Sequence, residues 1–226
     1  MAQKTNNGHR QRLRQRFLKD QGATMADYEM LELLLAFALP RIDTKPIAKT
    51  LLAEFKTIGA VLQADAHLLI RHKYISESSL TILQLVRATA LRLLRQDVMV
   101  EKHIISGWEK LLSYLYATMA RAKNEELRLL HLNHRYLLLV DEKLQQGTVN
   151  HTPFYVREVV KRVLEVGSSH IIIAHNHPSG YNKPSKSDIT ETRRLADALK
   201  AMDVGLHDHL IISHQGPYSF KHHGLL

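Results

Sequence analysis

The chain of 226 residues contains no cysteine. Disulfide bonds and cysteine-ligated metal centres are therefore excluded, and nothing in the composition indicates an oxidising compartment. No stretch approaches the roughly 18 apolar residues that a membrane-spanning helix requires. The polar, basic N-terminal segment lacks the apolar run of a signal peptide. We therefore expect a cytoplasmic protein without membrane contact, with a length that allows one or two domains.

The net charge of +9, from 31 Lys and Arg against 22 Asp and Glu, is unevenly distributed. Residues 1–24 contain a single acid, Asp20, and six cations, which together supply more than half of the net charge. These cations are Lys4, Arg10, Arg12, Arg14, Arg16 and Lys19. Such a segment could bind DNA through phosphate contacts, or it could be a solvated helix face that only aids solubility. No base-reading motif accompanies it, so both interpretations stay open.

The first hundred residues have a helical hydrophobic period, with no strand pattern and no group of residues suited to catalysis. Leu13 and Phe17 lie four residues apart, as on one face of a helix. Pro40 ends a strongly apolar stretch, and Asp43 with Pro46 marks the start of the next helix. The expected helices are residues 9–20, 27–39, from 44 onward, shorter pieces within 57–70, and 78–96. We therefore predict an all-helical N-terminal domain over residues 1–100.

The helical period ends around residues 97–106, and helices alternate with short strands after this break. Gly167 follows the last residue of an expected helix, as C-terminal glycines commonly do. The expected helices are residues 108–122, 156–166 and 188–202, and the expected strands are residues 127–132, 136–140, 147–149, 170–174, 208–213 and 218–220. This order predicts an α/β domain with a mixed sheet over residues 104–226.

The most informative stretch begins with the apolar run His170–Ala174, which predicts a buried strand. His175 and His177 end this strand, directly before the turn-forming residues 178–180. Side chains two residues apart on an extended chain point the same way, so both imidazoles can reach one metal ion. Asp188, near the start of the next helix, is the natural third ligand. Two histidines and one carboxylate leave a fourth position for water, which is the pattern of a catalytic zinc site.

Each part of this pattern also has a structural explanation. The chain has 15 histidines, so one His-x-His pair alone is a weak signal. Asp188 could be an N-cap, and Ser185 or Ser187 could cap the same helix. The combination of strand, His-x-His, tight turn, Ser-x-x-Asp and helix favours a metal site.

The segments His175–Gly180 (HNHPSG) and Pro184–Asp188 (PSKSD) resemble the JAMM motif of the MPN/JAB metallopeptidase fold. With Asn between the histidines and Pro-Ser-Gly after them, the chain is similar to the bacterial RadC family (UPF0758). The similarity covers nearly the whole chain and is also carried by residues 8–10, 27–35, 40–43, 157–159 and 208–211. It implies a cytidine-deaminase-like α/β domain that follows a helix-hairpin-helix-like domain. It further implies a zinc ion held by His175, His177 and Asp188, and hydrolysis of amide or isopeptide bonds in an unidentified protein or peptide.

A hydrolase of this kind needs a base beside the activated water. In JAMM enzymes the base is a Glu at the start of the first strand of the domain, and Glu125 and Glu126 both fit that position. Alignment of residues 127–132 with the family's strand favours Glu125. Glu158 is a further alternative, although an acid at the start of a helix also suits the helix dipole. By the same resemblance Ser185 orients water or stabilises the developing oxyanion, unless it only caps the helix.

Asp208 and His209 could support the metal site from outside or anchor a strand, and their position alone does not separate the two roles. The RadC resemblance also associates the chain with DNA repair or recombination, as a DNA-binding protein or a metal-dependent nuclease. However, the expected hairpin of the N-terminal domain, Lys73–Ser79, has no glycine, and glycine is what lets backbone N–H groups approach phosphate closely. The leading hypothesis is therefore a zinc-dependent hydrolase.

Overall fold

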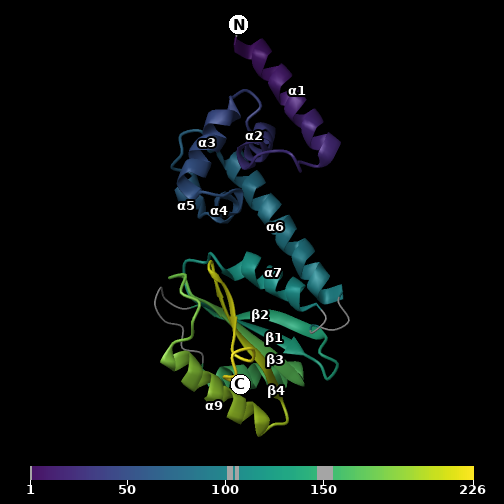
Figure 1. Ribbon diagram of the computed structural model, residues 1–226, viewed down its shortest axis with the longest axis vertical. Helices are drawn as coiled ribbons and strands as arrows, with labels where there is room; N and C mark the ends of the chain where they lie inside the picture. Colours follow the sequence, from purple (N-terminus) through teal and green to yellow (C-terminus); the bar gives the residue numbers. More distant parts are fainter. Residues whose placement is uncertain (1, 101–103, 105–106, 147–154) are drawn as a thin grey trace. The chain divides into compact units, whose positions relative to one another are not determined.

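The computed structural model describes residues 2–100, 104, 107–146 and 155–226 (Figure 1). The chain forms two compact units, Met1–Ala90 and Leu91–Leu226. Within the residues described, no helix combines the length and the apolarity needed to cross a membrane.

The first unit is all-helical, as predicted. Its helices are α1 (Ala2–Asp20), α2 (Asp27–Ala38), α3 (Thr44–Phe55), α4 (Ile58–Gln63), α5 (Ala66–Leu69) and most of α6 (Glu77–Val100). Side-chain oxygens of Asp43, Thr57 and Asp65 accept from backbone N–H groups at the starts of α3, α4 and α5, which satisfies donors that a helix start leaves unpaired. The buried core comprises Leu31, Leu35, Leu39, Ile47, Ala48, Leu51, Val61, Leu69, Ile75 and Leu83.

Cations of α1 are used inside this unit. The guanidinium of Arg10 is buried and donates to the carbonyls of Leu39 (2.9 Å), Pro40 and Ile42, which lie where α2 has ended and leaves acceptors unpaired. Arg16 pairs with Glu29 at 2.7 Å, and Arg14 lies over the ring of Phe37 at 5.3 Å. Arg10, Arg14 and Arg16 thus bind α1 to its own unit.

The second unit contains a mixed five-stranded sheet in the order β2-β1-β3-β4-β5. The α/β class with a mixed sheet is therefore confirmed. Only β3 and β4 are parallel, and all the other neighbours are antiparallel. The strands are β1 (Glu126–Leu132), β2 (Leu138–Gln146), β3 (His170–Asn176), β4 (Gly205–Ser213) and β5 (Gly216–Ser219), and the helices are α7 (Trp108–Met119), α8 (Val156–Val166) and α9 (Lys186–Lys200).

Helices cover the sheet on both faces (Figure 1). The strands supply alternate residues to the two cores. On β3, Ile172 and Ala174 join the core of α7, whereas Ile171 and Ile173 join the core of α8 and α9. Successive side chains of a strand point to opposite faces. His175 and His177 continue the odd-numbered series and therefore lie on the face that α9 covers.

Several element boundaries differ from the sequence-based expectation. The α7 helix ends at Met119 rather than near residue 122, because Asn176 Nδ2 donates to the carbonyls of Ala122 and Asn124 and fixes this segment in a non-helical path. The β2 strand begins at Leu138 rather than at Tyr136, which has a φ of 58° in the preceding turn. The strand expected at residues 147–149 lies outside the described residues.

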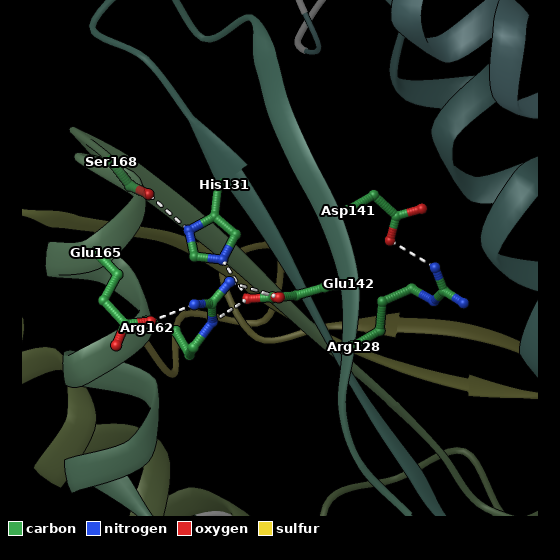
Figure 2. A network of polar contacts seen from close by, with 7 residues as sticks. All are labelled: Arg128, His131, Asp141, Glu142, Arg162, Glu165 and Ser168. Carbon is green, nitrogen blue, oxygen red and sulfur yellow. Dashed lines mark hydrogen bonds and ion pairs between the residues drawn. The ribbon is translucent and has the colours of Figure 1, made fainter.

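A partly buried polar network joins β1, β2 and α8 (Figure 2). His131 Nδ1 lies 2.6 Å from Ser168 Oγ, and its Nε2 lies 3.0 Å from Glu142 Oε1. Arg162 donates to both oxygens of Glu142 at 2.9 Å and also binds Glu165. Ser, His and acid follow one another as in a hydrolytic triad, but His131 has no exposed surface and Ser168 has 6%. We interpret the network as structural, because no substrate can reach either reactive atom.

Gly167 and Gly59 form a matched pair for testing how the chain ends α8. Both have open space where a Cβ would lie, but only Gly167 has a left-handed φ, of 72°. Gly167→Ala should therefore lower the free energy of unfolding of its unit by about 1 kcal/mol. Gly59→Ala, inside α4, should raise the stability of its own unit by about 0.5 kcal/mol. Urea unfolding followed by Trp108 fluorescence for the second unit and by circular dichroism for the first measures both. A change in unfolding free energy of the same sign in both variants would contradict this account.

His131 should make the stability of the second unit depend on pH. Burial lowers the pKa of His131 below its ordinary value, against the opposing attraction of Glu142. The unfolded chain, in which histidine titrates near about 6.5, then binds more protons than the folded one as pH falls through that value. Unfolding free energy should therefore decrease from pH 7.5 to pH 5.5, and His131→Gln should reduce this slope. Urea unfolding at the two pH values measures this pH dependence. If it were the same in His131→Gln as in the wild type, His131 would not be its source.

Candidate metal centre

The end of β3 and the start of α9 build the candidate site. His177 continues the sheet beyond β3, since its N–H donates to the carbonyl of Ile212 at 3.1 Å. A tight turn follows, in which the N–H of Gly180 donates to the carbonyl of His177. Gly180 has a φ of 87°, and a Cβ there would lie 1.7 Å from the ring of His214. Only glycine fits this position, so the turn after His177 is fixed by sterics.

The structure brings together the three residues predicted to be metal ligands. His175 Nε2 and His177 Nε2 are 2.9 Å apart. Asp188 Oδ1 is 3.7 Å from the former, and Asp188 Oδ2 is 3.6 Å from the latter. Donors that share a tetrahedral zinc ion at its usual bond lengths are separated by about 3.3 Å. The donor set and its spacing therefore fit zinc. Among the described residues, this is the one group of three or more His, Cys, Asp or Glu side chains placed to hold a metal ion.

His177 presents the correct nitrogen to this point. Its Nδ1 lies 2.7 Å from the carbonyl oxygen of Tyr181. A carbonyl oxygen can only accept, so Nδ1 carries the hydrogen and Nε2 of the neutral ring has a lone pair. The loop after β3 thus selects the tautomer of His177 that can bind a cation through Nε2.

Asp188 combines two roles that the sequence presented as alternatives. Ser185 is the N-cap of α9, and its Oγ accepts from the N–H of Asp188 at 3.1 Å. Asp188 Oδ2 accepts in return from the N–H of Ser185 at 2.7 Å. This capping box fixes the carboxylate at the positive end of the helix dipole, where an anion is stabilised. The same carboxylate still faces both histidines, so its capping does not compete with metal binding.

The site holds one anion and one ring that readily takes a proton. Burial lowers the pKa of His175 to about 4, against the attraction of Asp188, so this ring is neutral at pH 7. Burial also acts to lower the pKa of His177, but the interaction with Asp188, the Tyr181 carbonyl and the charge of Glu125 outweigh it and raise that pKa. Burial raises the pKa of Asp188, but the bonds to His177 and Ser185 and the charge of His175 lower it overall. The arrangement therefore attracts a positive charge to the point between the three ligands.

The register of the sheet separates Glu125 from Glu126. Leu127 of β1 pairs with His175 in an antiparallel ladder, so Glu125, two residues earlier, lies level with His177 and on the same face. Its charge acts on His177 and raises the pKa of that ring. Glu126 instead lies level with Asn176, whose Oδ1 accepts from its N–H at 2.7 Å, and its carboxylate pairs with Lys143 at 2.7 Å.

Glu158, the other sequence candidate for the base, is not part of this group. It lies on α8 and pairs with Arg157 at 3.2 Å, where both side chains are exposed. Two carboxylates therefore act on His177 through their charge: Asp188, a predicted metal ligand, and Glu125, which is not in the ligand group.

Asp208 and His209 have different environments, although they are neighbours on β4. His209 is fully buried, and its Nε2 lies 2.7 Å from His175 Nδ1. Asp208 accepts from Ser219 Oγ (2.6 Å) and from the N–H of Lys221 (3.0 Å), which ties β4 to the C-terminal segment. The two roles expected for this pair are thus divided: His209 contacts His175, a predicted metal ligand, and Asp208 anchors a strand.

Sequence reasoning missed two buried polar residues around the site. Thr192 lies four residues after Asp188 on α9 and contacts His209 Nδ1 at 2.6 Å. The i, i+4 spacing, which places both side chains on one face of the helix, was the available signal. Asn176 lies between the two histidines, on the opposite face of β3, and holds the chain segment that leads to Glu125.

A cavity of about 560 Å³ opens beside the turn after β3. Two cationic side chains, Arg121 and Lys123, line it together with Ala120, Ala122, Pro178, Ser179 and His214. Its walls therefore come from the segment that precedes Glu125 and from the loop that follows His177. The cavity therefore borders chain segments that adjoin two residues of the candidate site, Glu125 and His177.

Comparison with known proteins agrees with the geometry. Residues 105–225 match the family model described as the RadC-like JAB domain. A UPF0758 protein of Ruegeria pomeroyi (strain ATCC 700808 / DSM 15171 / DSS-3) is 43% identical over 218 residues, which is 96% of this chain and 97% of that protein. The similarity extends over both units.

Two variants of Ser185 test its role as the N-cap of α9. Ser185→Ala should reduce the unfolding free energy of the second unit by about 1 kcal/mol, because the N–H of Asp188 loses its acceptor. Ser185→Asn should retain the cap and most of the stability, since asparagine is equally favoured at this position. Urea unfolding of the two variants beside the wild type measures the difference. If the two variants were equally stable, the hydroxyl would not be acting as a cap.

Proposed function

Since this chain belongs to the RadC family, with a JAB domain over residues 105–225, we propose that it is a zinc-dependent hydrolase of the JAMM type. It would cleave an amide or isopeptide bond in a protein or peptide. The observation that carries the proposal is the group formed by His175, His177 and Asp188, whose ligand atoms all lie within 4.8 Å of one another. We further propose a cytoplasmic location, for which the absence of cysteine is the support.

Each residue of the site has a distinct task in this mechanism. His175 and His177, through Nε2, and Asp188, through its carboxylate, would hold the zinc ion. Zinc supplies Lewis acidity and lowers the pKa of water to about 7 when it is bound. Glu125, level with His177, accepts the proton of the attacking water and delivers it to the leaving amine. The chemistry thus needs one carboxylate for the proton and one for the metal.

Ser185 retains a hydrogen for the substrate. Its Oγ accepts from the N–H of Asp188, and a hydroxyl that accepts can still donate its own hydrogen. That O–H can stabilise the oxygen that becomes negative when the carbonyl carbon is attacked. Capping therefore supports this role by fixing the hydroxyl at the rim of the site.

The cavity beside the loop after His177 supports a proposal about the charge of the substrate. Arg121 brings a positive charge to its lining, which would favour substrates with an acidic group. A peptide library for the assay should therefore contain acidic and basic members with the same scissile bond.

DNA binding through the N-terminal segment stays a prediction, and the structure gives it less support than the sequence alone. Arg10, Arg14 and Arg16 interact with α2 and with the turn after it, which reduces the charge that α1 can offer to phosphates. Within the part of the chain that the structure describes, no observation favours a nuclease over a peptidase. We therefore advance only the hydrolase of amide or isopeptide bonds.

Matched substitutions at Glu125 and Glu126 test the mechanism. Glu125→Gln should retain bound zinc and lose about 10²- to 10⁴-fold in the rate of hydrolysis, the range expected for removal of a general base. Glu126→Gln breaks only the pair with Lys143 and should stay close to the wild-type rate. The assay uses quenched fluorescent peptides and isopeptides with zinc-loaded protein, and a chelator serves as the blank. Equal losses in the two variants would refute the assignment of Glu125, and chelator-sensitive cleavage of DNA alone would refute the choice of substrate.

A further inference from the structure

A chain of buried hydrogen bonds runs from the backbone of α9 to the candidate metal centre and begins at Thr192. This side chain is fully buried. Its Oγ1 lies 2.5 Å from the carbonyl oxygen of Asp188 and 2.6 Å from His209 Nδ1. A carbonyl oxygen cannot donate, so the hydroxyl gives its single hydrogen to Asp188 O. Oγ1 must therefore accept from His209, whose Nδ1 carries a hydrogen.

The position of the hydrogen on His209 determines the position of the hydrogen on His175. The His209 ring is fully buried and has one hydrogen in its neutral form, which Thr192 has placed on Nδ1. Its Nε2 is then an acceptor, and it lies 2.7 Å from His175 Nδ1. His175 therefore carries its own hydrogen on Nδ1, and a lone pair remains on Nε2. Burial keeps the pKa of His209 well below its ordinary value, in agreement with a neutral ring.

The geometry of the His209 ring is fixed from the opposite side. The ring of Phe220 stacks on it with centroids 4.4 Å apart and planes inclined by 20°. The N–H of Phe220 also donates to the carbonyl of His209 at 2.9 Å. His209 is therefore held between Thr192, His175 and Phe220, with little freedom to rotate.

We propose that Thr192 and His209 are positioning residues that hold His175 in the tautomer with hydrogen on Nδ1. They thereby reserve Nε2 of His175 for the metal, as the Tyr181 carbonyl does for His177. The inference rests on the metal site of the proposed function and adds to it the part of the protein that tunes zinc affinity. Partners that orient a ligating histidine from outside typically contribute about 10- to 100-fold to metal affinity.

The test measures zinc affinity by competition with a chromogenic chelator. His209→Leu removes the acceptor for His175 Nδ1 and should weaken zinc binding by about 10- to 100-fold. His209→Gln offers a carbonyl oxygen to His175 and an amide to Thr192, and should recover most of the affinity. Thr192→Val should weaken binding while Thr192→Ser preserves it, because only serine keeps the hydroxyl. His131→Gln serves as the control, since it replaces another fully buried histidine whose partners lie outside the site.

A second measurement separates this inference from the proposed function. Nitrogen-15 NMR of histidine side chains in the metal-free protein reports which nitrogen of each ring carries hydrogen, and His175→Gln assigns the signal. His175 should have its hydrogen on Nδ1 in the wild type and shift toward Nε2 in Thr192→Val. If the wild type bound no zinc, the proposed function would fail, but these spectra would still decide the inference. A wild-type His175 with hydrogen on Nε2, or equal zinc affinities in His209→Leu and His209→Gln, would overturn it.

Discussion

Two imidazole nitrogens that face each other at 2.9 Å beside a carboxylate are the interaction on which the site depends. Each ring has its outer nitrogen bound to another group, His177 to the carbonyl of Tyr181 and His175 to His209. Both Nε2 lone pairs therefore point at the same place, and they repel each other unless a cation lies between them. A proton on His177 meets this need partly, and the attraction of Asp188, the Tyr181 carbonyl and Glu125 favours that proton by raising the pKa of the ring. A zinc ion held as we propose would meet it fully, since Asp188 would bind it as well.

The fold supplies this arrangement from ordinary features of an α/β domain. Alternation along β3 places Ile171 and Ile173 in the core of α8 and α9 and His175 and His177 at the edge of the same face. The antiparallel ladder with β1 carries Glu125 to the level of His177. The capping box at the start of α9 holds Asp188 where the helix dipole favours a negative charge. The part of β3 that forms the core and the part that leads into the candidate metal centre are thus consecutive.

Most of this could be predicted from the sequence, because the decisive signals are local. The β3 strand, the histidine pair at its end, the helix that ends at Gly167 and the Ser-x-x-Asp start of α9 all lie within short segments with their own periodicity or capping residues. The roles of Asp208 and His209 could not be separated, because they depend on contacts with His175 and with the C-terminal segment that only the sheet creates. Thr192 was missed for the same reason, since its partner lies on another element. The use of Arg10 inside its own unit could not be predicted either, because its burial depends on where α2 ends.

The most direct test of the central claim is the zinc content of the purified chain and of a His175→Ala/His177→Ala double variant by elemental analysis. A catalytic site with two histidines and one carboxylate should hold about one zinc per chain in the wild type and lose it in the double variant. Zinc retained by the double variant would place the metal elsewhere. A wild type that took up no zinc from a zinc-supplemented buffer would contradict the claim that this site is built to hold a metal ion.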